Sequence, residues 1–139
     1  MMLRGNLLPL CEAGAIDRLW PTVEHMLTRV ADEKVTVSDI YQFVMDGTWM
    51  LWVCQIPDTK EITSVLVTEF IHYPQVTNLR VVFLSGDDED WAYGIKVFED
   101  FARINDCSEV EILGRKGWER VLRDQGFKLN HITLSKRIL

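Results

Sequence analysis

The stretch from residue 78 to residue 127 constrains the fold most, because it alternates between strand-like and helix-like patterns twice. Residues Leu79–Leu84 contain a β-branched and aromatic run of strand length. Between Asp88 and Asn105 the apolar residues recur at spacings of three and four, which is typical of one helix face. A strand over Glu109–Leu113 and a helix over Lys116–Gln125 complete the pattern. The crossover is long enough for parallel pairing, so the stretch predicts a right-handed βαβ unit.

The N-terminal part of the chain predicts one short strand and two helices. The strand lies within Met2–Leu10, and an apolar stripe at helical spacing covers Glu12–Val30. Pro21 falls inside this stripe and is expected to kink or restart the helix. The second helix is expected to begin after an N-cap at Ser38 and to end at Asp46–Gly47, since Gly is common just past a helix end.

Three strands separated by short turns are expected over residues 48–56, 61–73 and 76–84. Their short connections predict an antiparallel meander. A last strand is expected over Lys128–Ile138, where apolar and polar residues alternate. The chain therefore predicts a single α+β domain over residues 1–139, built on a mixed sheet.

Composition excludes several classes of protein. The sequence has 139 residues, 47% of them hydrophobic, which is enough for a packed core. It contains no apolar run near the roughly 20 residues of a membrane helix, and its N-terminus does not resemble a secretory signal. Three widely spaced cysteines give neither a disulfide framework nor a metal site. A net charge of −6 argues against a nucleic-acid surface. We expect a cytoplasmic protein that binds neither membrane nor metal.

Two loops follow the carboxyl ends of the predicted parallel strands, and ligands bind at such ends in α/β sheets. The first loop contributes Leu84, Ser85 and Gly86 as candidate cofactor-binding residues. The second contributes Arg115 and Lys116, which stand at a helix N-terminus and could hold an anion or an acidic partner. The chain from residue 108 onward is basic, with seven basic against four acidic residues. A solvated helix face is the simpler explanation of that excess.

The element order β-α-α-β-β-β-α-β-α-β resembles the GNAT superfamily of N-acetyltransferases over essentially the whole chain. The resemblance is carried locally by Ser108–Ile112, which leads into a helix that ends at Asp124–Phe127. The segment Gly114–Trp118 is similar to small GNAT-like proteins of tailed phages. The resemblance implies an acetyl-CoA site between the fourth and fifth strands, with the pyrophosphate on backbone N–H groups of a glycine-containing loop.

That loop departs from the family pattern. Members carry Arg/Gln-x-x-Gly-x-Gly/Ala, whereas Ser85–Trp91 reads Ser-Gly-Asp-Asp-Glu-Asp-Trp, with one glycine and four carboxylates. Carboxylates at this point would repel a pyrophosphate. They have a structural explanation, because acidic residues stabilise the first turn of a helix.

The last helix departs from the pattern as well. Many family members carry Asn-x-x-Ala-x-x-x-Tyr there, and the Tyr protonates the departing thiolate as a general acid. The matching positions in this sequence are Arg115, Trp118 and Leu122. Leu122 has no proton to donate, and Trp118 places an indole where the family has a small residue. We therefore expect no cofactor, or acetyl-CoA if the protein is active.

Candidate catalytic residues remain near the end of the second meander strand. In a GNAT-like sheet this region can face the acceptor amine, with Glu69 or His72 as the base and Tyr73 as a proton donor. The alternative is a strand end with solvent-facing polar side chains.

Two functions follow from these observations. The first is a GNAT-like protein with a degenerate acetyl-CoA site, encoded by a phage and acting through a protein partner in the virion or the host cytoplasm. Five tryptophans suit such an interaction surface, and a homo-oligomer is possible. The second is an active acyl-CoA-dependent N-acyltransferase with an atypical phosphate-binding loop.

Overall fold

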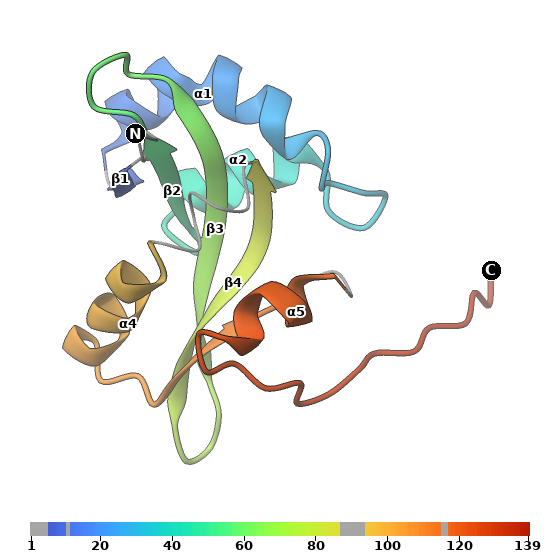
Figure 1. The fold of residues 1–139 in the computed structure, drawn as a ribbon. Helices are drawn as coiled ribbons and strands as arrows, with labels where there is room; N and C mark the ends of the chain where they lie inside the picture. Colours follow the sequence, from blue (N-terminus) through green and yellow to red (C-terminus); the bar gives the residue numbers. More distant parts are fainter. Residues whose placement is uncertain (1–5, 11, 87–93, 115–116) are drawn as a thin grey trace.

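One mixed sheet runs through the middle of the molecule, with helices on both faces (Figure 1). The computed structural model describes residues 6–10, 12–86, 94–114 and 117–139. Within these residues the sheet has five strands in the order β1-β2-β3-β4-β5. The first four pair antiparallel, and β4 pairs with β5 in parallel. The strands are β1 (Asn6–Leu10), β2 (Met50–Gln55), β3 (Ile62–His72), β4 (Thr77–Gly86) and β5 (Glu109–Ile112).

Helices α1 (Ala13–Leu27) and α2 (Val37–Met45) cover one face of the sheet. Their apolar sides pack against alternate residues of the two central meander strands, because successive side chains of a strand point to opposite faces. The buried residues of this core are Ile16, Val23, Met26, Leu27, Ile40, Val44, Leu51, Val53, Val65 and Val67.

Helices α4 (Ile95–Ile104) and α5 (Trp118–Arg123) cover the other face. The largest side chain of this second core is Trp52, which is 1% exposed. Its indole N–H donates a hydrogen bond to Thr68 Oγ1 at 2.9 Å, so the buried polar atom is satisfied. The rings of Phe98 and Phe101 meet it edge-on, with centroids 4.9 and 5.2 Å away. These contacts fix α4 on the sheet.

The meander, the parallel crossover and the alternation of helices predicted from the sequence are confirmed. Helix α1 runs through Pro21 without restarting, because residues on either side of the proline are buried in the same core. The N-cap of α2 is Thr36 and not Ser38. Thr36 forms a reciprocal capping box with Asp39, which satisfies two backbone N–H groups at once. No helix among the described residues is long and apolar enough to cross a membrane.

The prediction of a last strand over Lys128–Ile138 is wrong. The described residues 128–139 form no helix or strand and extend away from the body of the molecule (Figure 1). Alternation of apolar and polar residues suits a segment to a sheet, but a strand also needs a neighbouring backbone to pair with. In this structure the segment does not pair with β5, and Leu134 and Ile138 are 86% and 84% exposed.

Replacing Phe98 with alanine tests the second core. The ring is fully buried against Trp52, so we expect Phe98→Ala to lower the free energy of unfolding by about 3–5 kcal/mol. Urea denaturation measures the change. Ile104→Ala on the same helix is the matched control, because Ile104 is 80% exposed and its loss should cost less than about 0.5 kcal/mol. Equal effects of the two substitutions would contradict this packing.

Candidate functional site

Strands β4 and β5 pair over only part of the length of β4. The ladder begins at Asn78 and Glu109 and ends where Val81 pairs with Ile112, while β4 continues to Gly86. A bulge lies at the same point, because Val67 and Thr68 of β3 pair with Phe83 and Val81 and leave Val82 between them. Such a bulge bends a strand and increases its twist. β5 is paired over its whole length and ends at Ile112, so the last residues of β4 continue beyond it without a parallel neighbour among the described residues.

The three candidate cofactor residues at the end of β4 each have a structural role. Leu84 is buried in the core beneath α4. The Ser85 hydroxyl donates a buried hydrogen bond of 2.7 Å to the carbonyl oxygen of Met26 in α1. Gly86 has a φ of +127°, and a Cβ there would lie 2.2 Å from the Thr63 carbonyl oxygen, so only glycine fits. Contact with a cofactor would therefore fall to backbone atoms.

Residues 87–93, with most of the acidic loop, and the predicted anion-binding pair Arg115 and Lys116 lie outside the described residues. The helix that follows is described. Leu122, at the position of the family's general acid, is 5% exposed and belongs to the core beneath α4 and α5. Trp118 packs against the same core and lies over Gly114, where a Cβ would be 3.1 Å from the Trp118 Cβ. The structure thus explains both residues by packing.

A polar network joins β3, β4 and β5 next to the paired part of the parallel strands. Arg80 stands between two carboxylates. Its guanidinium donates to Glu111 Oε1 at 2.9 and 3.0 Å and lies 3.9 Å from Glu69 Oε1. The Tyr73 hydroxyl donates to Glu111 Oε2 at 2.6 Å and accepts from Arg80 at 3.2 Å. Trp49 donates to Glu69 Oε2 at 2.7 Å.

Asn78 anchors the inner end of this network. Its amide nitrogen donates to Glu109 Oε1 at 3.0 Å and to Glu111 Oε2 at 2.7 Å. The residue is 3% exposed, and its Oδ1 atom is buried with no hydrogen-bond partner among the described residues. Because the amide nitrogen serves both carboxylates, the oxygen must point away from them.

The network fixes the protonation of two of its members. Burial raises the pKa of Glu111, but the hydrogen bonds from Tyr73, Asn78 and Arg80 outweigh burial, so its pKa lies below the usual value. The hydrogen bond to Glu111 raises the pKa of Tyr73. Near neutral pH, Glu111 is therefore a carboxylate and Tyr73 a phenol that holds its proton. The network can donate that proton only after Tyr73 gives up its bond to Glu111.

The structure brings together two of the three candidate catalytic residues. Glu69 and Tyr73 both approach Arg80, whereas His72 points to the opposite face of β3, where its Nδ1 lies 3.0 Å from Thr77 Oγ1. The sequence analysis missed Arg80 and Glu111. Opposite charges at alternate positions of neighbouring strands were the available signal, but their register was unknown.

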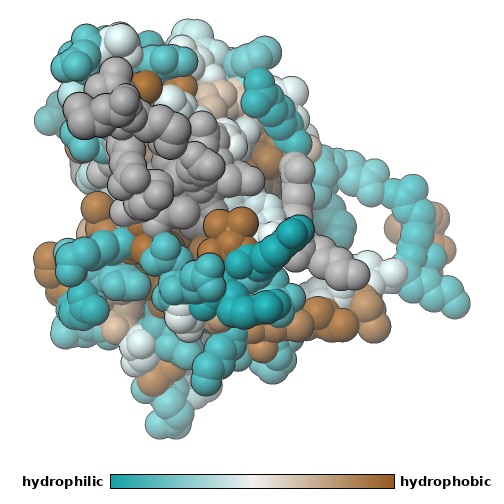
Figure 2. Space-filling view, in the orientation of Figure 1, coloured by the Kyte–Doolittle hydropathy of each residue, from teal (hydrophilic) through white to brown (hydrophobic). Residues whose placement is uncertain are grey.

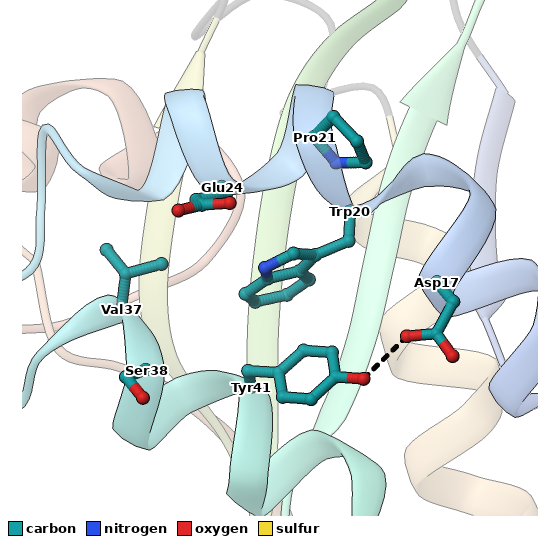
Figure 3. Close-up of a pocket in the computed structure, with 7 residues that line it drawn as sticks. All are labelled: Asp17, Trp20, Pro21, Glu24, Val37, Ser38 and Tyr41. Atoms are coloured by element: carbon teal, nitrogen blue, oxygen red, sulfur yellow. Dashed lines mark hydrogen bonds between the residues drawn. The ribbon is translucent and has the colours of Figure 1, made fainter.

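A second surface feature lies between α1 and α2 (Figure 3). A cleft of about 360 Å³ contains the indole of Trp20 and the phenol of Tyr41, whose ring centroids are 4.9 Å apart at 65°. The Tyr41 hydroxyl donates to Asp17 Oδ1 at 2.6 Å, which raises the pKa of Tyr41. The described residues that line the cleft carry two carboxylates and no basic group; they are Asp17, Trp20, Pro21, Glu24, Val37, Ser38 and Tyr41. Aromatic faces and carboxylates together suit a cation.

Among the described residues there is no group of three or more His, Cys, Asp or Glu side chains that could hold a metal ion.

Known structures share this fold over nearly the whole chain. A structure described as a probable acetyltransferase matches with a TM-score of 0.71 at 6% identity, covering 96% of this chain and 97% of that chain. An acetyltransferase from Trypanosoma brucei matches at 0.69 and 12%, covering 96% and 99%. The glucosamine-6-phosphate N-acetyltransferase of Arabidopsis thaliana matches at 0.69 and 10%, covering 95% and 98%. Neither a protein-family model nor a curated protein matches the sequence.

At these identities the likeness establishes the fold alone. The predicted α+β architecture of the GNAT acetyltransferases is confirmed, including the mixed five-strand sheet. The resemblance of Gly114–Trp118 to phage proteins receives no support from these structures.

Removing the charge of Glu111 tests the polar network. We expect Glu111→Gln to lower the free energy of unfolding by about 1–2 kcal/mol at pH 7, since the neutral amide keeps one acceptor oxygen and loses the charge that strengthens the hydrogen bonds from Arg80 and Tyr73. A carboxylate with a lowered pKa stabilises the fold above its unfolded pKa of about 4.3 and stops doing so as the pH falls through its folded pKa.

The difference between wild type and Glu111→Gln should therefore shrink as the pH falls below about 4. Urea denaturation across the acid range measures it. Glu109→Gln is the control, because Glu109 accepts a hydrogen bond from Asn78 alone in the network. A pH-independent difference for Glu111→Gln would contradict the proposed protonation.

Proposed function

We propose that this GNAT-fold, acetyltransferase-like protein has a degenerate acetyl-CoA site and acts through a protein partner. The observation that carries the proposal is the burial of Leu122, at 5% exposure, where many family members place the tyrosine that protonates the departing thiolate. A leucine in the core can neither donate a proton nor reach a ligand between the strands. At this position the side chain therefore packs in the core and supplies no hydroxyl group.

The sequence of the β4–α4 connection supports the same proposal. In the sequence, the four carboxylates of Asp87–Asp90 fall at the positions that the resemblance matches to the family's glycine-containing pyrophosphate loop. Near a protein surface, two like charges that lie 4 Å apart repel each other by about 4 kcal/mol. The residues present therefore do not fit a doubly charged phosphate linker.

The cleft between α1 and α2 is the part of the described surface best suited to a partner (Figure 3). The Trp20 and Tyr41 rings offer aromatic faces, and Asp17 and Glu24 offer negative charge. An arginine or lysine side chain satisfies both features, since its stem packs on rings and its charge pairs with carboxylates. We therefore expect a partner that presents a basic side chain here.

A second candidate function is an active acyl-CoA-dependent N-acyltransferase. The end of β4 favours it, because β4 continues beyond β5 and ligands bind at the carboxyl ends of parallel strands. In this case Glu69 would take the proton of the acceptor amine and Tyr73 would supply a proton. Arg115 and Lys116 would hold the phosphates, and acetyl-CoA would supply the acyl group.

Calorimetric titration with acetyl-CoA separates the two functions. We expect no binding heat at acetyl-CoA concentrations into the millimolar range, because the acidic loop repels the phosphates. Micromolar binding would overturn the degenerate site. In that event, Arg115→Glu with Lys116→Glu should abolish the binding if these residues form the atypical phosphate site. Arg120→Glu with Arg123→Glu on α5 is the charge-matched control.

A titration with N-acetyl-arginine amide tests the cleft, with tryptophan fluorescence as the signal. We expect a saturable change that disappears in Trp20→Phe. Asp17→Asn with Glu24→Gln should weaken the binding by about tenfold, because two exposed ion pairs contribute up to about 1 kcal/mol each.

Asp58→Asn with Glu61→Gln, in the turn between β2 and β3, removes the same charge outside the cleft. Binding that falls equally in both double variants would reflect net charge and contradict a specific cation site.

A further inference from the structure

The C-terminal segment, residues 128–139, exposes several large apolar side chains, and exposed apolar surface of this kind marks interaction sites. It runs out beyond α5 (Figure 1), on a side of the molecule where Figure 2 also shows hydrophobic residues at the surface. Five of its large apolar side chains are exposed by 63% or more: Leu129, Ile132, Leu134, Ile138 and Leu139. Burying these side chains against other apolar surface would be favourable, because apolar surface is unfavourable in water.

The order of residues in this segment is that of a half-buried strand. Ile132, Leu134 and Ile138 fall on one side of an extended chain, with Lys136 between the last two, and Thr133, Ser135 and Arg137 fall on the other. A segment that is always surrounded by water needs no alternation of apolar and polar residues. The segment therefore carries one face for a core and one face for water.

The edge of the sheet at β5 could pair with such a strand. In the described structure β5 is an edge strand that pairs only with β4, so its outer backbone groups are available to another strand. Val110 and Ile112 pack toward the core beneath α4 and α5. Glu109 and Glu111 lie on the other face, in the polar network. A strand added to this edge would need an apolar face and a polar, preferably basic, face.

The C-terminal segment meets both needs. Its apolar side would extend the core next to Val110 and Ile112, and its polar side brings Arg137 toward the carboxylates of β5. In the described structure an ion pair between Arg137 and Glu33, at 2.5 Å, links the segment to the rest of its own chain. Both side chains are more than 70% exposed, and exposed ion pairs contribute little to stability. The ion pair therefore stabilises this position of the segment less than burial of three large apolar side chains would stabilise another.

We propose that residues 130–138 of one chain add as a strand to β5 of a second copy, and that the second copy reciprocates. The exchange gives a closed two-fold dimer, because the same edge and the same segment serve both chains. Each exchanged strand pairs the open edge of β5 and buries the exposed apolar side chains together. The inference is independent of acetyl-CoA binding and of the α1–α2 cleft.

Light scattering after size-exclusion chromatography tests the exchange on the full chain. We expect wild type to have twice the mass of one chain, and Ile132→Lys with Leu134→Lys to have the mass of one chain. Thr133→Lys with Ser135→Lys adds the same charge to the same segment on the opposite face, and this variant should remain a dimer. Circular dichroism of each variant confirms that the fold is retained.

A wild-type monomer at all concentrations would overturn the proposal, as would a dimer that survives Ile132→Lys with Leu134→Lys. Hydrogen exchange distinguishes pairing between two chains from pairing within one chain. Protection of residues 130–138 in a monomer would mean that the segment pairs with β5 of its own chain. Cross-linking of a mixture of isotopically light and heavy chains should give light–heavy pairs between the segment and β5.

Discussion

The bend in β4 is the constraint on which the rest of the structure depends. The strand pairs with β3 along its length and with β5 over a short ladder, and the bulge at Val82 falls where that ladder ends. Helices pack on both faces of the sheet, so straightening the strand would disturb two cores. The stretch of β4 that continues beyond β5 is therefore a property of the folded chain and needs no ligand to create it.

The described side chains at the end of β4 and in α5 are nevertheless committed to the fold. Ser85 ties β4 to α1, Gly86 allows β4 to pass close to β3, and Leu122 completes the core beneath α5. The polar network is equally self-contained, because Glu111 already accepts hydrogen bonds from Tyr73, Asn78 and Arg80. Substitutions at these positions are thus expected to change stability before they change any chemistry.

Local periodicity predicted most of the fold, because helix and strand faces here are set by burial within each element. It failed where the outcome depends on a partner: the segment 128–139 has a strand pattern but no neighbour in this chain. The choice of Thr36 over Ser38 as a cap depended on the carboxylate of Asp39 three residues after Thr36, a signal that was present in the sequence. The network around Arg80 required the register of three strands, which no local pattern supplies.

The fold does not by itself argue for a retained activity. Leu84, on the part of β4 beyond the end of β5, is covered by packing in the core beneath α4. In this chain Trp118 lies over Gly114 at the end of β5 and packs against the core, where the family has a small residue. A large indole at this point covers surface that a smaller side chain would leave exposed. Packing of this kind holds the fold whether or not a cofactor binds, so the fold by itself does not decide the activity.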